Sequence, residues 1–247
     1  MPAFVNIENL SFSYEEKQSV LKNINLQIHS GEKFGIIGPM GAGKSTLLLH
    51  LNGILSGAGR VMIDDVEVCK KNLPAIRRKV GLVYQNPDDQ LFNPTVEEDV
   101  AFGPLNFGFT KDQVRQMVAV ALESMKLQGY EKRVSHHLSM GEKKRVAIAT
   151  VLATQPDVIA FDEPFANLDP AMISQFVGII NKLRSTLVII SQSFLPVVAC
   201  CDRIALINNG EIAAIGPTLE ILKNDKLLKE NGIDLSMYKN VCQLLFS

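Results

Sequence analysis

The chain has 247 residues, of which 47% are hydrophobic and 21% are charged, and its formal net charge is −1 at pH 7. This composition predicts one large folded domain and excludes a disordered protein. A net charge so close to zero provides no basic field that would gather phosphates, so nucleic acid is not an expected partner.

From the residues printed we expect no signal peptide and no membrane-spanning segment. Its first residues, MPAFVNIENLSFSY, lack the cationic start and the apolar stretch of a signal peptide. Apolar runs such as VAIATVLA, residues 146–153, are far shorter than the roughly twenty residues that span a bilayer. The cysteines show no C-x-x-C spacing and fit a reducing compartment: Cys69, Cys200, Cys201 and Cys242. We therefore expect a cytoplasmic protein that reaches a membrane only through a partner.

Strand patterns dominate the beginning of the chain, where apolar residues alternate or run together in 4–14, 20–38 and 60–68. From about residue 95 the apolar residues recur at helical spacing instead. Beyond residue 155, short buried strands alternate with helices, which is the order of a parallel α/β sheet. In this part the strands are 157–162, 186–191 and 203–208, and the helices are 169–183 and 194–201.

These patterns predict a single α/β domain that spans 1–247 and is interrupted by a helical insertion. The α/β core takes up about 1–94 and 155–230, and the helical lobe about 95–154. Residues 231–247 form a tail with one amphipathic stretch. No repeat, low-complexity tract or flexible linker divides the chain further.

The segment GPMGAGKST, residues 38–46, follows an apolar strand and precedes a helical segment. This is the context that a phosphate-binding P-loop requires. Gly38 and Gly43 let the backbone turn and present N–H groups to phosphate, Lys44 reaches the β- and γ-oxygens, and the Ser45 hydroxyl can ligate Mg²⁺. The alternative is a plain glycine-rich turn, which does not explain Lys-Ser directly after the last glycine.

A second apolar strand ends in the carboxylates Asp162 and Glu163, within VIAFDEP. We expect this strand to lie beside the P-loop strand. Asp162 would then hold Mg²⁺, and Glu163, which we expect to face away from the core, would act as the general base on the attacking water. The alternative is a strand end with two solvated acids.

The stretch HHLSMGEKKR, residues 136–145, contains Ser139 three residues before Glu142, which is the capping-box pattern of a helix N-terminus. Gly141 leaves backbone N–H groups uncovered beside the Ser139 hydroxyl, at the positive end of the helix dipole. From these residues alone, both a helix cap and a phosphate clamp are open.

In chain order, Tyr14, the P-loop, Gln85, LSMGE, DEP, Leu168-Asp169 and Gln192 resemble the ATP-binding cassette (ABC) family over 3–230. The resemblance implies a P-loop fold with a mixed or parallel core sheet, an N-terminal antiparallel β-subdomain and an inserted helical subdomain. It also implies that two subunits enclose two ATP molecules, each held by the P-loop of one and by Ser139 and Gly141 of the other. The implied P-loop contacts are Gly38, Pro39, Met40, Gly41, Ala42, Gly43, Lys44, Ser45 and Thr46.

The remaining roles follow from the same resemblance. Tyr14 would stack on adenine, although a half-buried strand tyrosine is an alternative. Gln85 would contact metal and water and link the site to the helical lobe, so the implied metal ligands are Ser45, Gln85 and Asp162. Asp169 would cross the dimer seam, although an ordinary helix N-cap is an equal alternative.

Three residues depart from the family pattern. The signature sequence of the family usually reads LSGGQ, whereas this chain has Met140 in place of the first glycine and Glu142 in place of the glutamine. Gln192 stands where a histidine normally contacts the γ-phosphate. Glutamine donates a hydrogen bond but has no cationic form. We predict slower hydrolysis than at an intact site. A heterodimer whose partner supplies an intact signature is one explanation, and a slow ATP-gated regulatory subunit is an alternative function.

Three longer segments, 47–55, 86–108 and 136–153, resemble the ATPases of energy-coupling-factor (ECF) importers, most closely the cobalt/nickel branch. Vitamin importers share much of them. The resemblance implies a transmembrane coupling protein that docks near Gln85 and the helical lobe, a membrane subunit that binds substrate, and a peripheral position on the cytoplasmic face. DNA-repair ATPases would carry a long coiled coil, and translation-factor ATPases two cassettes; this chain has neither.

Overall fold

The computed structural model describes residues 3–14 and 19–236. The amino-terminal part forms an antiparallel sheet in the order β2-β1-β4-β5. Its long strands alternate buried and exposed side chains, as expected for a sheet that packs on one face only. The strands are β1 (Ala3–Ser13), β2 (Ser19–His29), β4 (Ala58–Ile63) and β5 (Val66–Glu67).

A second sheet has six strands in the order β10-β9-β3-β8-β7-β6. The strands β9, β3, β8, β7 and β6 run parallel, and β10 pairs antiparallel with β9 at one edge. The carboxyl ends of the parallel strands therefore meet along one edge of the sheet, where ligands bind in such folds. The strands are β3 (Lys33–Ile37), β6 (Val80–Val83), β7 (Val158–Asp162), β8 (Thr186–Ile190), β9 (Arg203–Asn208) and β10 (Glu211–Pro217).

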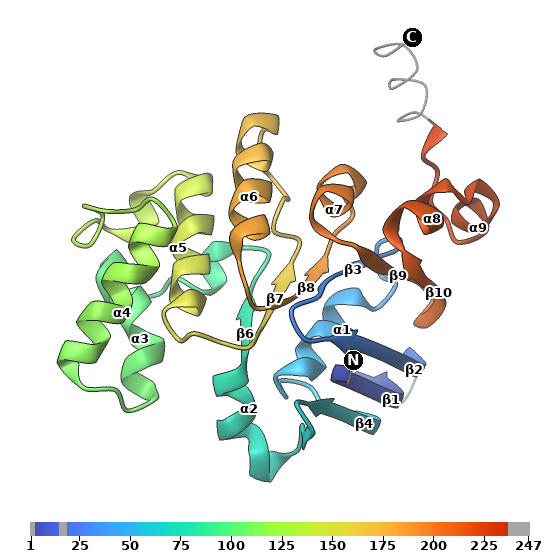
Figure 1. The fold of residues 1–247 in the computed structure, drawn as a ribbon, viewed down its shortest axis with the longest axis horizontal. Coiled ribbons are helices and arrows are strands. Elements are labelled where there is room, and N and C mark those ends of the chain that lie inside the picture. Colours follow the sequence, from blue (N-terminus) through green and yellow to red (C-terminus); the bar gives the residue numbers. More distant parts are fainter. Residues whose placement is uncertain (1–2, 15–18, 237–247) are drawn as a thin grey trace.

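Helices cover both faces of the six-stranded sheet. The P-loop helix α1 (Lys44–Leu51) packs between the two sheets, and α3, α4 and α5 form a lobe beside the edge strand β6 (Figure 1). The other helices are α2 (Leu73–Lys79), α3 (Val96–Asn106), α4 (Lys111–Ser124), α5 (Met140–Leu152), α6 (Pro170–Lys182), α7 (Phe194–Cys200), α8 (Thr218–Lys223) and α9 (Asp225–Glu230). Short 3₁₀ turns occupy Lys70–Asn72, Pro87–Asp89 and Ser135–His137.

Alternate residues of the parallel strands enter two separate hydrophobic cores. In β7, Val158 and Ala160 pack into the core that contains α1 and the antiparallel sheet. Ile159 and Phe161 pack into the core that contains α5, α6 and α7. Because both faces are covered, these strands are apolar throughout, which is the pattern that the sequence shows.

The fold class predicted from the sequence is confirmed, but the expected neighbour of β7 is wrong. We expected β7 to lie beside the P-loop strand β3, whereas β8 pairs with both and separates them. The sequence analysis did not predict α2, the short strand β6, the edge strand β10, or the helices α8 and α9. Across the described residues, no helix is both long and apolar enough to cross a bilayer. Most of the expected tail, 237–247, lies outside the described residues.

Candidate functional site

The P-loop is shaped by glycines that lie against neighbouring backbone. A Cβ on Gly38 would collide with the carbonyl oxygen of Ile207 in β9. Gly43 has φ +97°, and a Cβ there would lie 2.8 Å from the carbonyl oxygen of Val20. Glycine tolerates both conditions because it has no side chain. The loop therefore passes close to β2 and β9 and enters α1 directly after Gly43.

Lys44 is buried at the start of α1, and its Nζ donates hydrogen bonds to the carbonyls of Gly38 and Pro39, each at 2.9 Å. Burial lowers the pKa of this ammonium, and the charges of Glu163 and Asp162 oppose the shift. The loop thus encloses a cation that faces two carboxylates.

The end of β7 reaches the P-loop helix even though β8 lies between β7 and β3. The Ser45 hydroxyl donates to Oδ1 of Asp162 at 3.1 Å. Burial raises the pKa of Asp162, while the Ser45 hydrogen bond and the Lys44 charge lower it. A hydroxyl and a carboxylate oxygen at this separation are the kind of ligand pair that a hard divalent cation uses.

Glu163 is buried, with 6% of its surface exposed, so the alternative of two solvated acids is wrong. Its backbone is in the left-handed region, with φ +46°. Oε2 accepts a hydrogen bond of 3.0 Å from the backbone N–H of Gln192, and Oε1 has no partner among the described residues. Burial raises the pKa of Glu163. A carboxylate with one unpaired, shielded oxygen is suited to accept a proton from a water molecule.

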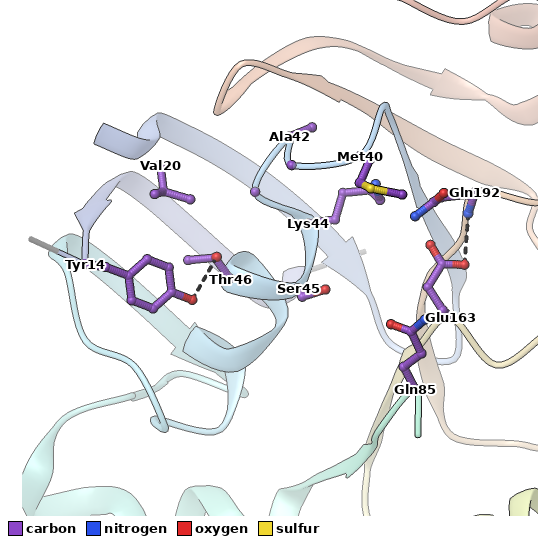
Figure 2. A pocket seen from close by; sticks show the side chains of 12 residues that line it. Tyr14, Val20, Met40, Ala42, Lys44, Ser45, Thr46, Gln85, Glu163 and Gln192 are labelled. Carbon is purple, nitrogen blue, oxygen red and sulfur yellow. Dashed lines mark hydrogen bonds between the residues drawn. The ribbon is translucent and has the colours of Figure 1, made fainter. Parts of the chain in front are cut away.

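These groups surround a pocket of about 460 Å³. Figure 2 shows Tyr14 at one end of this pocket, the P-loop in the middle, and Gln85, Glu163 and Gln192 at the other end. The residues that line it are Tyr14, Val20, Met40, Gly41, Ala42, Gly43, Lys44, Ser45, Thr46, Gln85, Glu163 and Gln192. Of these, Val20 was not identified from the sequence, because nothing in a strand valine marks it as a site residue.

Tyr14 is 60% exposed, so the alternative of a half-buried strand tyrosine is wrong. Its hydroxyl shares a hydrogen bond of 3.1 Å with the Thr46 hydroxyl, and its ring packs edge-on against Phe12 with centroids 4.9 Å apart. The ring is thereby held at the pocket rim. Its stacking on adenine stays a prediction.

Gln85 is exposed and lines both this pocket and an adjoining one of about 290 Å³ that also contacts Asp162 and Met140. The loop that carries Gln85 is fastened to α5 by a residue that the sequence analysis missed. The Gln90 side chain accepts from the Tyr84 backbone N–H at 3.1 Å and donates to the Ala147 carbonyl at 2.9 Å. A single glutamine gives no sequence signal for such a role.

The same loop is held to α5 by charge as well. Lys143 of α5 pairs with Asp88 at 2.7 Å. Hydrogen bonds and an ion pair therefore connect the Gln85 loop to the helical lobe, which is the physical requirement for the linking role that the resemblance implies.

Ser139 is the N-cap of α5, and its side chain accepts from the Glu142 N–H in a complete capping box. The predicted cap is therefore confirmed. Neither Ser139 nor Gly141 lines the P-loop pocket of its own chain. Gly141 packs on α6, where a Cβ would lie 2.8 Å from Cε of Met172. The phosphate clamp stays a prediction, and in this geometry it would serve a nucleotide bound to another subunit.

Glu142, one of the departures from the family pattern, is held by several donors. The Tyr130 hydroxyl donates to Oε1 at 2.7 Å, and the backbone N–H and hydroxyl of Ser139 each donate to Oε2 at 2.8 Å. These hydrogen bonds, with the charge of Arg133 at 3.9 Å, lower the pKa of Glu142 to about 2. Glu142 is therefore a fixed anion at the start of α5.

Asp169 caps α6, because its side chain accepts from the Met172 N–H at 2.8 Å. The alternative of a helix N-cap is confirmed. Asp169 does not line the P-loop pocket, and a role across a dimer seam stays a prediction.

A P-loop between parallel strands, a buried lysine and two strand-end carboxylates together define a P-loop nucleotide hydrolase. The ABC transporter family model matches residues 21–166. An energy-coupling factor transporter ATP-binding protein, EcfA, from Methanothermobacter thermautotrophicus is 46% identical over 237 residues, which cover 94% of this chain and 76% of that protein. The chain belongs to the ABC transporter family and is an ATP-hydrolysing transporter subunit.

Two solved structures are similar to the whole fold. The structure of cbiO1 from Clostridium perfringens, part of the ABC transporter complex cbiONQ, has a TM-score of 0.84 at 32% identity and covers 98% of this chain and 100% of that one. A dimeric ATP-binding cassette in a post-hydrolysis state with ADP and phosphate has a TM-score of 0.77 at 27% identity, with 87% and 98% covered. The predicted resemblance to ECF-type ABC ATPases is confirmed.

The Glu142 network predicts a pH-dependent contribution to stability. Because folding lowers the Glu142 pKa from 4.5 to about 2, the ionised carboxylate stabilises the fold above about pH 4.5, and this contribution is lost as the pH falls toward 2. We expect Glu142→Gln to lower the free energy of unfolding by about 1 kcal/mol at pH 7 and by less at pH 4. Urea unfolding at the two pH values measures this difference, with Glu220→Gln as the exposed control. A deficit that grows at pH 4 would contradict the assignment.

Proposed function

We propose that this chain is the ATPase of an ECF-type importer, and that it works as a dimer, with a second copy or a homologous ATPase, closing around two ATP molecules. One observation carries the proposal. Lys44, Glu163 and Gln192 meet at one pocket, whereas Ser139, the second expected phosphate contact, lies outside it. A nucleotide in this pocket therefore needs Ser139 and Gly141 from another subunit to complete its surroundings. The similarity to a dimeric cassette supports this arrangement.

Within the pocket, each residue of the chain has a distinct task. The N–H groups of the P-loop and the Lys44 ammonium would bind the phosphates, and Tyr14 would cover adenine. Glu163 would orient a water molecule and accept its proton at Oε1, the buried oxygen that has no partner among the described residues. The Gln192 side chain would donate a hydrogen bond to the terminal phosphate.

We propose Mg²⁺ as the cofactor of bound ATP. The donor set fits this ion, since the Ser45 hydroxyl and the Asp162 carboxylate lie 3.1 Å apart and the amide oxygen of Gln85 comes from the adjoining loop. When bound, the ion would neutralise charge that develops on the β- and γ-phosphates.

A membrane partner is expected to dock beside the Gln85 loop, at an exposed aromatic pair. Phe92 and Phe102 are 59% and 47% exposed, and their rings pack edge-on with centroids 4.9 Å apart. Buried Asp99 fixes the loop that carries Phe92, because its carboxylate accepts hydrogen bonds from the N–H groups of Phe92 and Asn93 at 3.0 and 2.9 Å. Exposed aromatic side chains on an ordered support favour a protein contact. The chain would thus lie on the cytoplasmic face of the membrane, bound to a coupling protein that also holds a substrate-binding subunit.

The proposed cargo is cobalt or nickel, because 47–55, 86–108 and 136–153 resemble the ATPases of that branch. Vitamin import is the alternative within the same class. A slow ATP-gated regulatory subunit is a second candidate, favoured by the anionic Glu142 and by the uncharged Gln192 at the pocket. Uptake assays with radiolabelled cobalt, nickel and vitamins, using the membrane proteins that co-purify with the chain, distinguish these cargoes.

Glu163→Gln tests the general base. The substitution keeps the side-chain shape but removes the proton acceptor, so we expect the turnover of Mg-ATP to fall by roughly 10²–10⁴-fold while the Kd for ATP changes little. Steady-state turnover and nucleotide binding measure the two quantities. Glu220→Gln, on the surface of α8, is the control. Equal turnover by wild type and Glu163→Gln would favour the regulatory function instead.

Gln192→His tests the missing cation at the terminal phosphate. The backbone N–H that holds Glu163 is kept in this variant, so only the side chain changes. We expect turnover to rise by about 2–10-fold, because a charged donor binds developing charge more strongly, with a larger rise at pH 6 than at pH 8. Gln192→Ala is the matched variant and should be slower than wild type. No change in Gln192→His at either pH would argue against a rate limited by this residue.

Phe92→Ala and Phe102→Ala test the docking surface. Both side chains lie outside the P-loop pocket, so ATP turnover by the chain alone should not change. Co-purification with the membrane partner, and any stimulation by it, should fall by about tenfold or more, as expected for aromatic hot spots. Leu219→Ala removes an equally exposed apolar side chain from α8 and should have no effect. A double variant that still binds the partner normally would place the docking surface elsewhere.

A further inference from the structure

Lys144, in the second turn of α5, is a buried cation that none of the roles above explains. Only 4% of its surface is exposed. Its Nζ donates to the backbone carbonyls of Glu163 at 3.3 Å and Pro164 at 3.0 Å. Within the described part of the chain, no carboxylate lies close enough to form an ion pair with it. Burying an ammonium costs free energy unless dipoles or charges compensate it. Here the two backbone carbonyls that it binds provide that compensation.

These carbonyls belong to the residue that the site depends on and to its neighbour. Glu163 has a left-handed backbone, which is unfavourable for a residue with a side chain. Its N–H donates to the Ile190 carbonyl at 3.0 Å, and its carbonyl faces Lys144. Lys144 and β8 therefore hold opposite sides of this peptide segment, and the segment sets the direction in which the Glu163 carboxylate points.

Lys144 keeps its positive charge in this buried position. Burial lowers the pKa of Lys144 to about 8, and the charge of Glu163 opposes that shift, so the ammonium is largely protonated at pH 7. The protonated amine has three N–H donors, and this is the form that binds the carbonyls of Glu163 and Pro164.

We propose that Lys144 is a positioning residue for Glu163. From α5, the helix that Ser139 caps, Lys144 fixes the backbone of this general base. This inference rests on the proposed function, in which Glu163 activates water. Lys144 does not contact nucleotide; it acts through the carbonyls of Glu163 and Pro164.

The position of Lys144 on α5 has a consequence for the dimer. Ser139 and Lys144 are five residues apart on one helix, which is about 7.5 Å along its axis. A nucleotide of the opposite subunit that binds at Ser139 would contact α5. The same helix binds the Glu163 backbone through Lys144. The two ATP sites of a dimer would then be connected through Lys144.

Lys144→Met tests the inference, because methionine fills the buried space but donates no hydrogen bond. We expect kcat to fall by at least tenfold, while KM and the Kd for ATP stay within about twofold of wild type, since the P-loop is untouched. Lys144→Gln keeps two N–H donors and should recover part of kcat. Val146→Ala, at a buried apolar position of the same helix, controls for a loosened α5: it should lower the melting temperature but keep kcat.

Glu163→Gln is assayed in parallel, so that a failure of the proposed function can be distinguished from a failure of the positioning role. If Glu163→Gln keeps full turnover, the proposed function is wrong. If Glu163→Gln is inactive but Lys144→Met keeps wild-type kcat, the proposed function stands and the positioning role is overturned. The positioning role would also be overturned if Val146→Ala, with the same melting temperature as Lys144→Met, lost as much kcat. Recovery in Lys144→Gln with unchanged ATP affinity supports it.

Discussion

The structure depends on one electrostatic arrangement, in which a buried lysine faces two strand-end carboxylates at the carboxyl edge of a parallel sheet. Lys44 comes from the P-loop after β3, and Asp162 and Glu163 come from the end of β7. Each charge would be costly alone in this pocket, and the three partly compensate one another. In the proposed function the phosphates of ATP would add negative charge to the same place, so their binding would need both the lysine and further donors from the loop.

This pocket also explains why the chain is expected to work in pairs. The capping box fixes Ser139 and the start of α5 in the helical lobe, away from the P-loop pocket. The lobe is not independent of the pocket, however, because Gln90 and Lys143 tie the Gln85 loop to α5. A ligand at the Ser139 end of α5 and a ligand in the pocket would therefore act on one connected unit, which is what coupling between two sites requires.

The sequence predicted the parts whose chemistry is local. The P-loop needs glycine, lysine and serine at fixed spacing, and a helix cap needs Ser139 and Glu142 three residues apart, so both patterns are visible without a structure. The sequence did not predict which strands are neighbours, because the apolar strands look alike; β8 therefore came between β3 and β7 unexpectedly. Gln90 was also missed, since its importance comes from contacts between distant parts of the chain.

The departures from the family pattern do not weigh equally once their contacts are known. Glu142 adds a negative charge near the expected clamp, but both of its oxygens already accept hydrogen bonds, and Arg133 lies 3.9 Å away. Its charge is thus directed toward its own helical lobe and is partly neutralised there. Gln192 has no such compensation, because it lines the pocket and carries no charge that replaces a histidine cation. The slower hydrolysis expected of this chain should therefore come mainly from Gln192, and the signature can keep its capping role and still present Ser139 to a neighbouring subunit.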